Sequence, residues 1–88
     1  MTLKQELIEF IRKSLIPGGE SALIDDNEPL IDRGIIDSMG LLQIMTFIEE
    51  RTGVRIPDDD VTPDNFQTVA SIDRMVARLK ERQGSGGR

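Results

Sequence analysis

The strongest constraint on the fold is that apolar side chains recur every three to four residues in three separate segments of the chain. These segments predict one helix over residues 3–15, a second over residues 38–52 and a third that begins after Thr68. Thr2 and Gln5 have the spacing of a capping box at the start of the first helix, and Pro17-Gly18-Gly19 ends that helix. The expected buried positions of the first and third helices are Leu3, Leu7, Ile8, Phe10, Ile11, Leu15, Val69, Ile72, Met75, Val76 and Leu79.

A short fourth helix is predicted between the second and the last of these helices. Thr62 can cap it, because a hydroxyl oxygen accepts a hydrogen bond from a free N–H of the first turn, and Pro63 suits the first helical position. This helix ends near Phe66. The expected fold is therefore all-α, a four-helix bundle of three longer helices and one short helix. With three Phe, no Trp and no Tyr, its core must be built mainly from Leu, Ile, Val and Met.

Residues 16–37 form a long connection between the first two long helices. A connection of this length is uncommon in a compact domain unless something holds it in place. Five apolar side chains can do so by packing against the helices: Ile24, Leu30, Ile31, Ile35 and Ile36. The connection carries acids at Glu20, Asp25, Asp26, Glu28 and Asp32, and the last four of these suggest a calcium site as one alternative. Their spacing does not match the calcium-binding EF-hand loop, so we expect a solvated acidic loop and no metal site.

The stretch Gly34-Ile35-Ile36-Asp37-Ser38-Met39 closes this connection and opens the second helix. Asp37 can cap the helix by accepting hydrogen bonds from its free N–H groups, and its charge suits the positive helix end. Ser38 then lies at the boundary between loop and helix, where its hydroxyl can point to solvent. Because Asp and Ser are common at helix starts, spacing alone favours a purely structural role for both residues.

The second helix has too many apolar residues for a single buried face. At about 100° per residue, the face predicted to join the core holds Leu41, Ile44, Met45 and Ile48, with Phe47 at its edge. A separate stripe holds two apolar residues and the polar residues beside them: Met39, Leu42, Thr46, Glu49 and Glu50. An exposed apolar stripe is typical of a contact surface, so these five residues are candidates for partner binding. The alternative is that the long connection covers the stripe.

The stretch at residues 34–39 resembles the attachment motif of the acyl carrier protein family, which includes peptidyl and D-alanyl carriers. The usual Asp-Ser-Leu core of the family is here Asp37-Ser38-Met39. The resemblance continues through Phe47-Ile48-Glu49-Glu50-Arg51-Thr52-Gly53-Val54-Arg55-Ile56-Pro57, through Thr62-Pro63-Asp64-Asn65-Phe66 and into the final helix, so it covers roughly residues 3–82. Fatty-acid carriers usually show acids early in the second helix. This chain has Gly40, Leu41 and Gln43 there, and in this respect is more similar to aminoacyl, peptidyl or D-alanyl carriers.

The resemblance implies the acyl-carrier type of four-helix bundle and a carrier function rather than an enzymatic one. Ser38 would bear 4′-phosphopantetheine, whose thiol holds an acyl or aminoacyl group as a thioester, and Asp37 would help the modifying enzyme position its magnesium. The implied partners are a phosphopantetheinyl transferase that uses coenzyme A, an adenylating ligase or acyltransferase that loads the thiol, and a downstream transferase or synthase. The alternative is a helical protein-interaction domain in which Ser38 is never modified.

Composition excludes several other functions. The chain has no Cys and no His, which removes disulfides, thiolate chemistry and most catalytic triads and zinc sites. Its net charge of −5 disfavours binding to nucleic acids and to anionic membrane surfaces, and no apolar run is long enough to span a membrane. We expect a free-standing, monomeric, cytoplasmic protein with a carrier domain at residues 1–83 and a flexible tail at residues 84–88.

Overall fold

The computed structural model describes residues 2–16, 18 and 23–83 of the chain. It contains the long helices α1 (Leu3–Ser14), α2 (Ser38–Thr52) and α4 (Val69–Arg82), the short helix α3 (Pro63–Phe66) and one 3₁₀ turn, η2 (Asp58–Asp60). Within these described residues there is no strand, so the predicted all-α fold of three longer helices and one short helix is confirmed. The predicted tail, together with Pro17 and Gly19 of the predicted helix stop, lies outside the described part of the chain.

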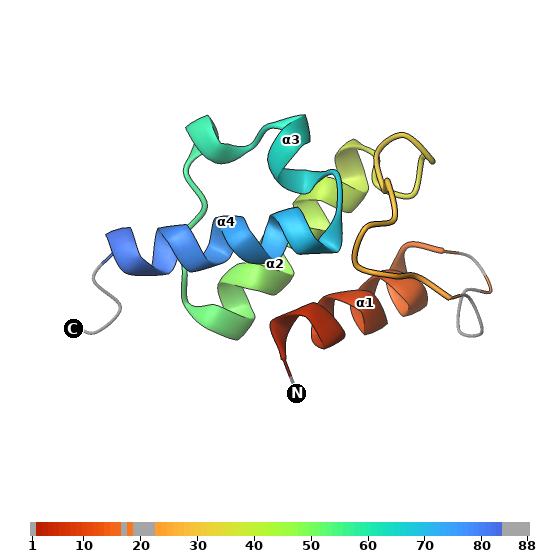
Figure 1. Ribbon diagram of the computed structural model, residues 1–88, viewed down its shortest axis with the longest axis horizontal. Helices are drawn as coiled ribbons and strands as arrows, with labels where there is room; N and C mark the ends of the chain where they lie inside the picture. The colour runs from red at the N-terminus through yellow and green to blue at the C-terminus, as the bar shows by residue number, and fades with distance from the viewer. Residues whose placement is uncertain (1, 17, 19–22, 84–88) are drawn as a thin grey trace.

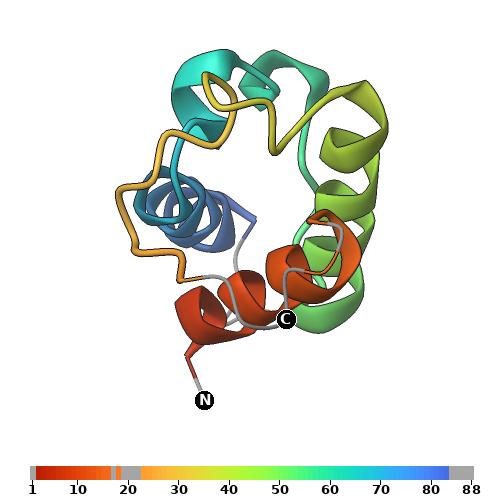
Figure 2. The ribbon, with the colours of Figure 1, turned by 90° about the vertical axis from the view of Figure 1, so that its right-hand side faces the viewer.

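The four helices surround a common centre. Figure 1 shows α4 crossing the molecule with α1 on one side and α3 on the other, and the view in Figure 2 shows α2 completing the ring. In Figure 2 the long connection passes along α4 and then α3 before it reaches the start of α2. None of the helices in the ranges given above is both long enough and apolar enough to cross a membrane.

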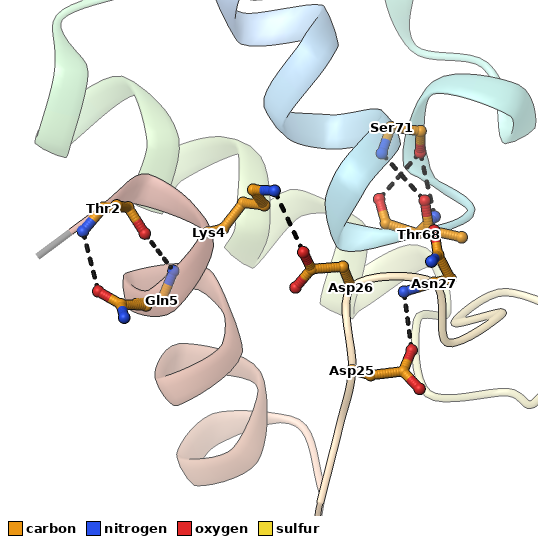
Figure 3. Close-up of polar contacts among 8 residues, drawn as sticks. All are labelled: Thr2, Lys4, Gln5, Asp25, Asp26, Asn27, Thr68 and Ser71. Carbon is orange, nitrogen blue, oxygen red and sulfur yellow. Dashed lines mark hydrogen bonds and ion pairs between the residues drawn. The ribbon is translucent and has the colours of Figure 1, made fainter.

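Side-chain caps fix the starts of the helices. The Thr2 hydroxyl accepts a hydrogen bond from Gln5 N at 3.2 Å, and Gln5 Oε1 accepts one from Thr2 N at 3.1 Å, which confirms the predicted capping box (Figure 3). Thr68 caps α4 in the same reciprocal way with Ser71, a partner that the sequence did not single out. The predicted cap of α3 is also present, because the Thr62 hydroxyl accepts from Asn65 N. Each cap satisfies N–H groups that have no partner inside the helix.

The core is entirely apolar among the described residues, and all four helices contribute to it. Leu41 and Met45 of α2, which we expected to be core residues, are only half-buried and pack against the core from its edge. Leu41 is less enclosed because it lines an open pocket at the start of α2. The buried residues are Leu7, Ile11, Leu30, Ile36, Ile44, Ile48, Val54, Ile56, Phe66, Val69, Ile72, Met75, Val76 and Leu79.

The long connection is held in place by apolar side chains, as predicted. Leu30 and Ile36 are buried, and Ile24, Ile31 and Ile35 are half-buried against the core. These contacts explain how a chain segment with little regular structure can be part of a compact bundle.

Two of the acids in the connection form ion pairs, which corrects the expectation of a solvated acidic loop for these two residues. Asp26 Oδ2 lies 3.1 Å from Lys4 Nζ of α1 (Figure 3). The Asp26 backbone carbonyl accepts a hydrogen bond from Ala70 N of α4. Glu28 forms an ion pair with Arg33. In the described ranges, no group of three or more acids is arranged to hold a metal ion. These two acids therefore tie the connection to itself and to two helices.

Candidate functional site

The start of α2 is built around Asp37. This residue has an extended backbone, with φ −111° and ψ −168°, and its Oδ1 accepts a hydrogen bond from Gly40 N at 2.8 Å. Asp37 is therefore the N-cap of α2, as predicted. Ser38 is the first residue of the helix and is exposed to solvent, so its hydroxyl is accessible to a macromolecular partner.

The backbone turns tightly just before this cap. Gly34 has φ +75°, a left-handed conformation that glycine adopts without steric cost. The Leu30 carbonyl accepts hydrogen bonds from both Ile35 N and Ile36 N, at 2.9 Å and 3.2 Å. Because Ile36 is buried and directly precedes Asp37, this turn fixes where the polypeptide leaves the core and enters α2.

A shallow, mainly apolar pocket of about 260 Å³ opens beside Ser38. One wall comes from the connection and α2, and the other comes from α3 and the residues before it. Sequence reasoning did not place the second wall in the site, since only the folded topology brings α3 next to the start of α2. The residues lining the pocket are Ile31, Ile36, Asp37, Ser38, Leu41, Val61, Thr62, Pro63 and Phe66.

The candidate partner-binding stripe on α2 is exposed in the structure. The Met39 side chain is 66% exposed and the Leu42 side chain is 60% exposed, so the described part of the connection does not cover them. Thr46 and Glu50 are also exposed, and both line a wide hollow of about 490 Å³ that continues to Phe10 of α1. The accessible surface therefore extends beyond the predicted stripe to the edge of α1.

Within the described part of the chain, Glu49 differs from the rest of the stripe because its side chain has a hydrogen-bond partner. Its Oε2 accepts a hydrogen bond from Ile56 N at 3.2 Å, which holds the segment that follows α2. This contact could not be read from helical spacing, because Ile56 lies beyond the end of the helix.

An aromatic stack joins α1 to α2 beside the hollow. The rings of Phe10 and Phe47 are stacked with their centroids 4.5 Å apart, and the Arg51 guanidinium lies 5.5 Å from the Phe47 centroid. Arg51 Nε also lies 3.2 Å from Glu6 Oε1 of α1. We expected Phe10 to face the core and Phe47 to lie at the edge of the core face of α2. We did not expect the two rings to contact each other, because the pairing depends on how the two helices pack.

The chemistry available at the start of α2 is that of an acceptor. A serine hydroxyl is exposed, the neighbouring carboxylate is engaged with Gly40 N, and the chain contains no Cys or His. A serine becomes a strong nucleophile only when a base such as histidine takes its proton. The site is therefore suited to receive a group from another enzyme.

Comparisons with known proteins agree with this chemistry. The family model described as "Phosphopantetheine attachment site" matches residues 6–79. The "Probable acyl carrier protein PigG" of Serratia sp. (strain ATCC 39006) is 32% identical over 85 residues, covering 97% of each protein. The "D-alanyl carrier protein" of Streptococcus sanguinis (strain SK36) is 32% identical over 80 residues, covering 91% of this chain and 98% of that protein.

One relative of lower identity and one solved structure extend the comparison. "Aminoacyl carrier protein 2" of Bradyrhizobium diazoefficiens is 26% identical over 76 residues, covering 86% of this chain and 84% of that protein. A chain in the solved structure called "Crystal structure of FAD-dependent dehydrogenase" superposes with a TM-score of 0.73 at 30% identity, covering 81% of this chain and 99% of that one. Since the family model and the first two relatives span nearly the whole sequence, the chain belongs to the phosphopantetheine attachment family and is an acyl or aminoacyl type of carrier protein, served by modifying and loading enzymes and not itself a catalyst.

Proposed function

We propose that Ser38 is the residue that bears 4′-phosphopantetheine and that the thiol of this arm carries the cargo as a thioester. The observation that carries the proposal is that Ser38 is an exposed hydroxyl at the first position of α2, directly after the capping acid. A phosphodiester at this position would lie against the free N–H groups and the positive end of the helix dipole, where negative charge is stabilised. The apolar pocket beside Ser38 offers the arm and its cargo a surface to rest on.

Asp37 has a second role in this proposal. Its carboxylate has two oxygens, and the helix cap uses Oδ1. Oδ2 can then help a phosphopantetheinyl transferase position the magnesium ion that accompanies coenzyme A. The transfer joins the Ser38 hydroxyl oxygen to the phosphopantetheine phosphate and releases adenosine 3′,5′-bisphosphate.

The cargo is an amino acid in our proposal. The first turn of α2 contains no acid, whereas fatty-acid carriers usually have acids there. Several relatives are named as D-alanyl or aminoacyl carriers, which supports the same class of cargo. An adenylating ligase would activate the amino acid as its adenylate, and the thiol of the arm would displace AMP to form the thioester. An acyltransferase is the loading enzyme if the cargo is instead an acyl group from coenzyme A.

The docking surface for these enzymes is the stripe Met39, Leu42, Thr46, Glu49 and Glu50. Its apolar side chains are exposed beside Ser38, and its acids suit a basic partner surface, which acts mainly on the association rate. The carrier acts as a monomer made of residues 1–83, with residues 84–88 as a tail. It works in the cytoplasm, where coenzyme A and ATP are available to the modifying and loading enzymes.

A downstream transferase or synthase takes the cargo from the arm. A flavin-dependent dehydrogenase is a further candidate for acting on the loaded arm, because a carrier-sized chain of similar fold is part of a structure called an FAD-dependent dehydrogenase. Such an enzyme would move two hydrogens from the cargo to FAD, leaving an unsaturated thioester and reduced flavin. Loss of the oxidised-flavin absorbance with the aminoacyl carrier, and not with the unloaded carrier, would support this assignment.

The attachment residue is tested by co-producing the protein with a broad-specificity phosphopantetheinyl transferase and measuring its intact mass. The parent should gain the mass of one phosphopantetheine group, and Ser38→Ala should gain nothing while keeping the parental circular dichroism spectrum. Ser14→Ala is the matched control, because Ser14 is an exposed serine at the opposite end of a helix, and it should be modified like the parent. Modification of Ser38→Ala would show that another residue bears the arm.

A further inference from the structure

We propose that Gln67 is a positioning residue for the reactions at Ser38, acting through the loop that leads to it; this inference rests on the proposed role of Ser38. Gln67 lies between α3 and α4 and is half-buried. Its side-chain Oε1 accepts hydrogen bonds from Ile31 N at 3.1 Å and Asp32 N at 3.2 Å. Its backbone carbonyl accepts a third from Leu30 N at 2.7 Å. One residue thus binds three consecutive N–H groups of the long connection.

The loop segment bound by Gln67 is linked directly to the attachment residue. Leu30 is fully buried, and its carbonyl accepts hydrogen bonds from Ile35 N and Ile36 N. Ile36 is itself buried and is followed at once by Asp37 and Ser38. The Gln67 side chain reaches the same turn through Ile31, whose N–H it binds and whose carbonyl accepts a hydrogen bond from Gly34 N at 3.0 Å. Both the backbone bond and the side-chain bonds of Gln67 therefore lead to the cap of α2.

The Gln67 side chain is not needed to hold the helices themselves. The cap of α4 is made by Thr68 with Ser71, and the neighbouring core positions are filled by Phe66 and Val69. Among the described residues, the bonds lost when the amide is removed are those to Ile31 and Asp32, because the bond to Leu30 uses the backbone. Loss of the amide should therefore loosen the loop more than it destabilises the bundle.

A loosened loop should impair enzymes that act on Ser38. These enzymes must hold the hydroxyl and the preceding acid in one geometry, and a preformed loop lowers the ordering cost of that complex. Gln67 does not line the pocket beside Ser38, but it directly follows α3, which forms one wall of that pocket, and its side chain binds Ile31, which lies on the other wall. The clamp thus joins the end of α3 to the loop.

The chain contains a matched control for this clamp. Gln83, at the end of α4, binds a different loop: its Oε1 accepts from Arg55 N at 3.1 Å and its Nε2 donates to the Arg55 carbonyl at 2.6 Å. Arg55 follows the C-terminal end of α2, whose 15 residues separate it from Ser38 by about 20 Å. Gln83→Met therefore removes the same type of clamp far from the site.

The experiment compares Gln67→Met, Gln67→Glu and Gln83→Met with the parent. Methionine keeps the length of the side chain but has only a weakly accepting sulfur in place of the amide oxygen, and glutamate keeps oxygens that can accept both N–H bonds. Three quantities are measured for each: amide hydrogen exchange by NMR, the melting temperature, and kcat/KM for phosphopantetheine transfer to Ser38.

In Gln67→Met we expect the hydrogen-exchange rates of the Ile31 and Asp32 amides to rise by about tenfold, which is the scale of losing two hydrogen bonds of ordinary strength. Its kcat/KM should fall about tenfold as well, mainly through KM, because the open loop must be ordered on binding.

The remaining variants decide whether the effect comes from the clamp. Gln67→Glu should restore both loop protection and transfer, and Gln83→Met should alter exchange near Arg55 while leaving transfer at the parental rate. The inference is overturned if Gln67→Met frees the loop amides without slowing transfer, or if Gln83→Met slows transfer equally. If Gln67→Met does not fold cooperatively, Gln67→Asn replaces it and is measured in the same three ways. Its side chain is one methylene too short for the carbonyl to reach both amides, so it also tests whether the clamp affects transfer to Ser38. Failure of the proposed function is distinct, because the parent itself would then go unmodified at Ser38.

Discussion

The Asp37 carboxylate and the Gly40 backbone are in close contact across the first turn of α2. Oδ1 of Asp37 accepts a hydrogen bond from Gly40 N at 2.8 Å, and a Cβ placed on Gly40 would lie 3.4 Å from the same oxygen. That Cβ would also lie 3.5 Å from a methyl carbon of Leu15, at the end of α1. The space between Gly40, the Asp37 carboxylate and Leu15 is therefore just wide enough for a methyl group, and the hydrogen bond to Gly40 N positions the acid.

Substitutions at Asp37 separate its two roles. Asp37→Ala removes the cap and the charge, and should lower the free energy of unfolding by about 1 kcal/mol. Asp37→Asn keeps an oxygen for the cap, so it should unfold much like the parent. Both variants should slow phosphopantetheine transfer markedly, because both lose the acid beside Ser38. Urea unfolding and phosphopantetheine-transfer rates, measured for the same variants, test this prediction. A parental transfer rate in Asp37→Asn would show that Asp37 acts only as a helix cap.

Gly40→Ala should stabilise the protein although Gly40 is buried. The nearest atoms to the new Cβ lie at 3.4–3.6 Å, which is ordinary van der Waals contact, so the methyl group fits. Alanine in a helix is favoured over glycine by up to about 1 kcal/mol, and the free energy of unfolding should rise by a fraction of that amount. Gly40→Leu is the size control, and should destabilise by about 1–3 kcal/mol through overpacking. Urea midpoints measure both, and a marked loss in Gly40→Ala would mean that the turn cannot accept a methyl group.

The same substitution at Gly53 should have the opposite sign. Gly53 ends α2 with φ +74°. Apart from its two neighbours in sequence, no described residue has an atom within 4 Å of a Cβ placed there, so any cost comes from the backbone and not from crowding. A left-handed conformation costs an L-residue about 1–2 kcal/mol, and Gly53→Ala should lower the free energy of unfolding by that amount. Gly53→Asn should cost less, because asparagine tolerates this conformation better. Equal stability of the Ala variant and the parent in urea would contradict this account.

The helices could be predicted from sequence because their determinants are local. Each predicted helix boundary has a signal that acts over one turn of the chain and lies within one residue of the observed boundary. These signals are Thr2 with Gln5, Thr62 with Pro63, and Gly53 after α2. The same holds for Asp37 as the cap of α2. Apolar spacing likewise identified the buried face of α4 completely, since that face is a property of one helix.

The tertiary contacts of the site could not be predicted, because they join residues far apart in the sequence. Lys4 and Asp26 are 22 residues apart, and Gln67 contacts Ile31 from 36 residues away. No periodicity marks such pairs. Glutamine between two helices has many possible partners, and only the packing of the connection against α3 and α4 selects one. The same limit applies to the pocket wall from α3 and to the ring stack of Phe10 with Phe47.

Leu42 and Ile48 distinguish the recognition surface from the core within one helix. Leu42 is 60% exposed and Ile48 is fully buried, so Leu42→Ala should change the free energy of unfolding by no more than about 0.5 kcal/mol. Ile48→Ala leaves a cavity and should cost about 2–5 kcal/mol. Conversely, Leu42→Ala should raise the KM of a loading or modifying enzyme, because the truncated side chain lies on the proposed docking stripe.

The control for Leu42 is Leu23, which is 95% exposed but lies in the connection and not on α2. Leu23→Ala should change neither stability nor enzyme kinetics, so a general effect of removing surface apolar area can be separated from an effect of the stripe. Urea unfolding and steady-state loading kinetics of the three variants make the comparison. If Leu42→Ala proves as destabilising as Ile48→Ala, the stripe is covered in solution and cannot be the recognition surface. If Leu23→Ala raises KM as much as Leu42→Ala does, the contact with the enzyme is not specific to α2.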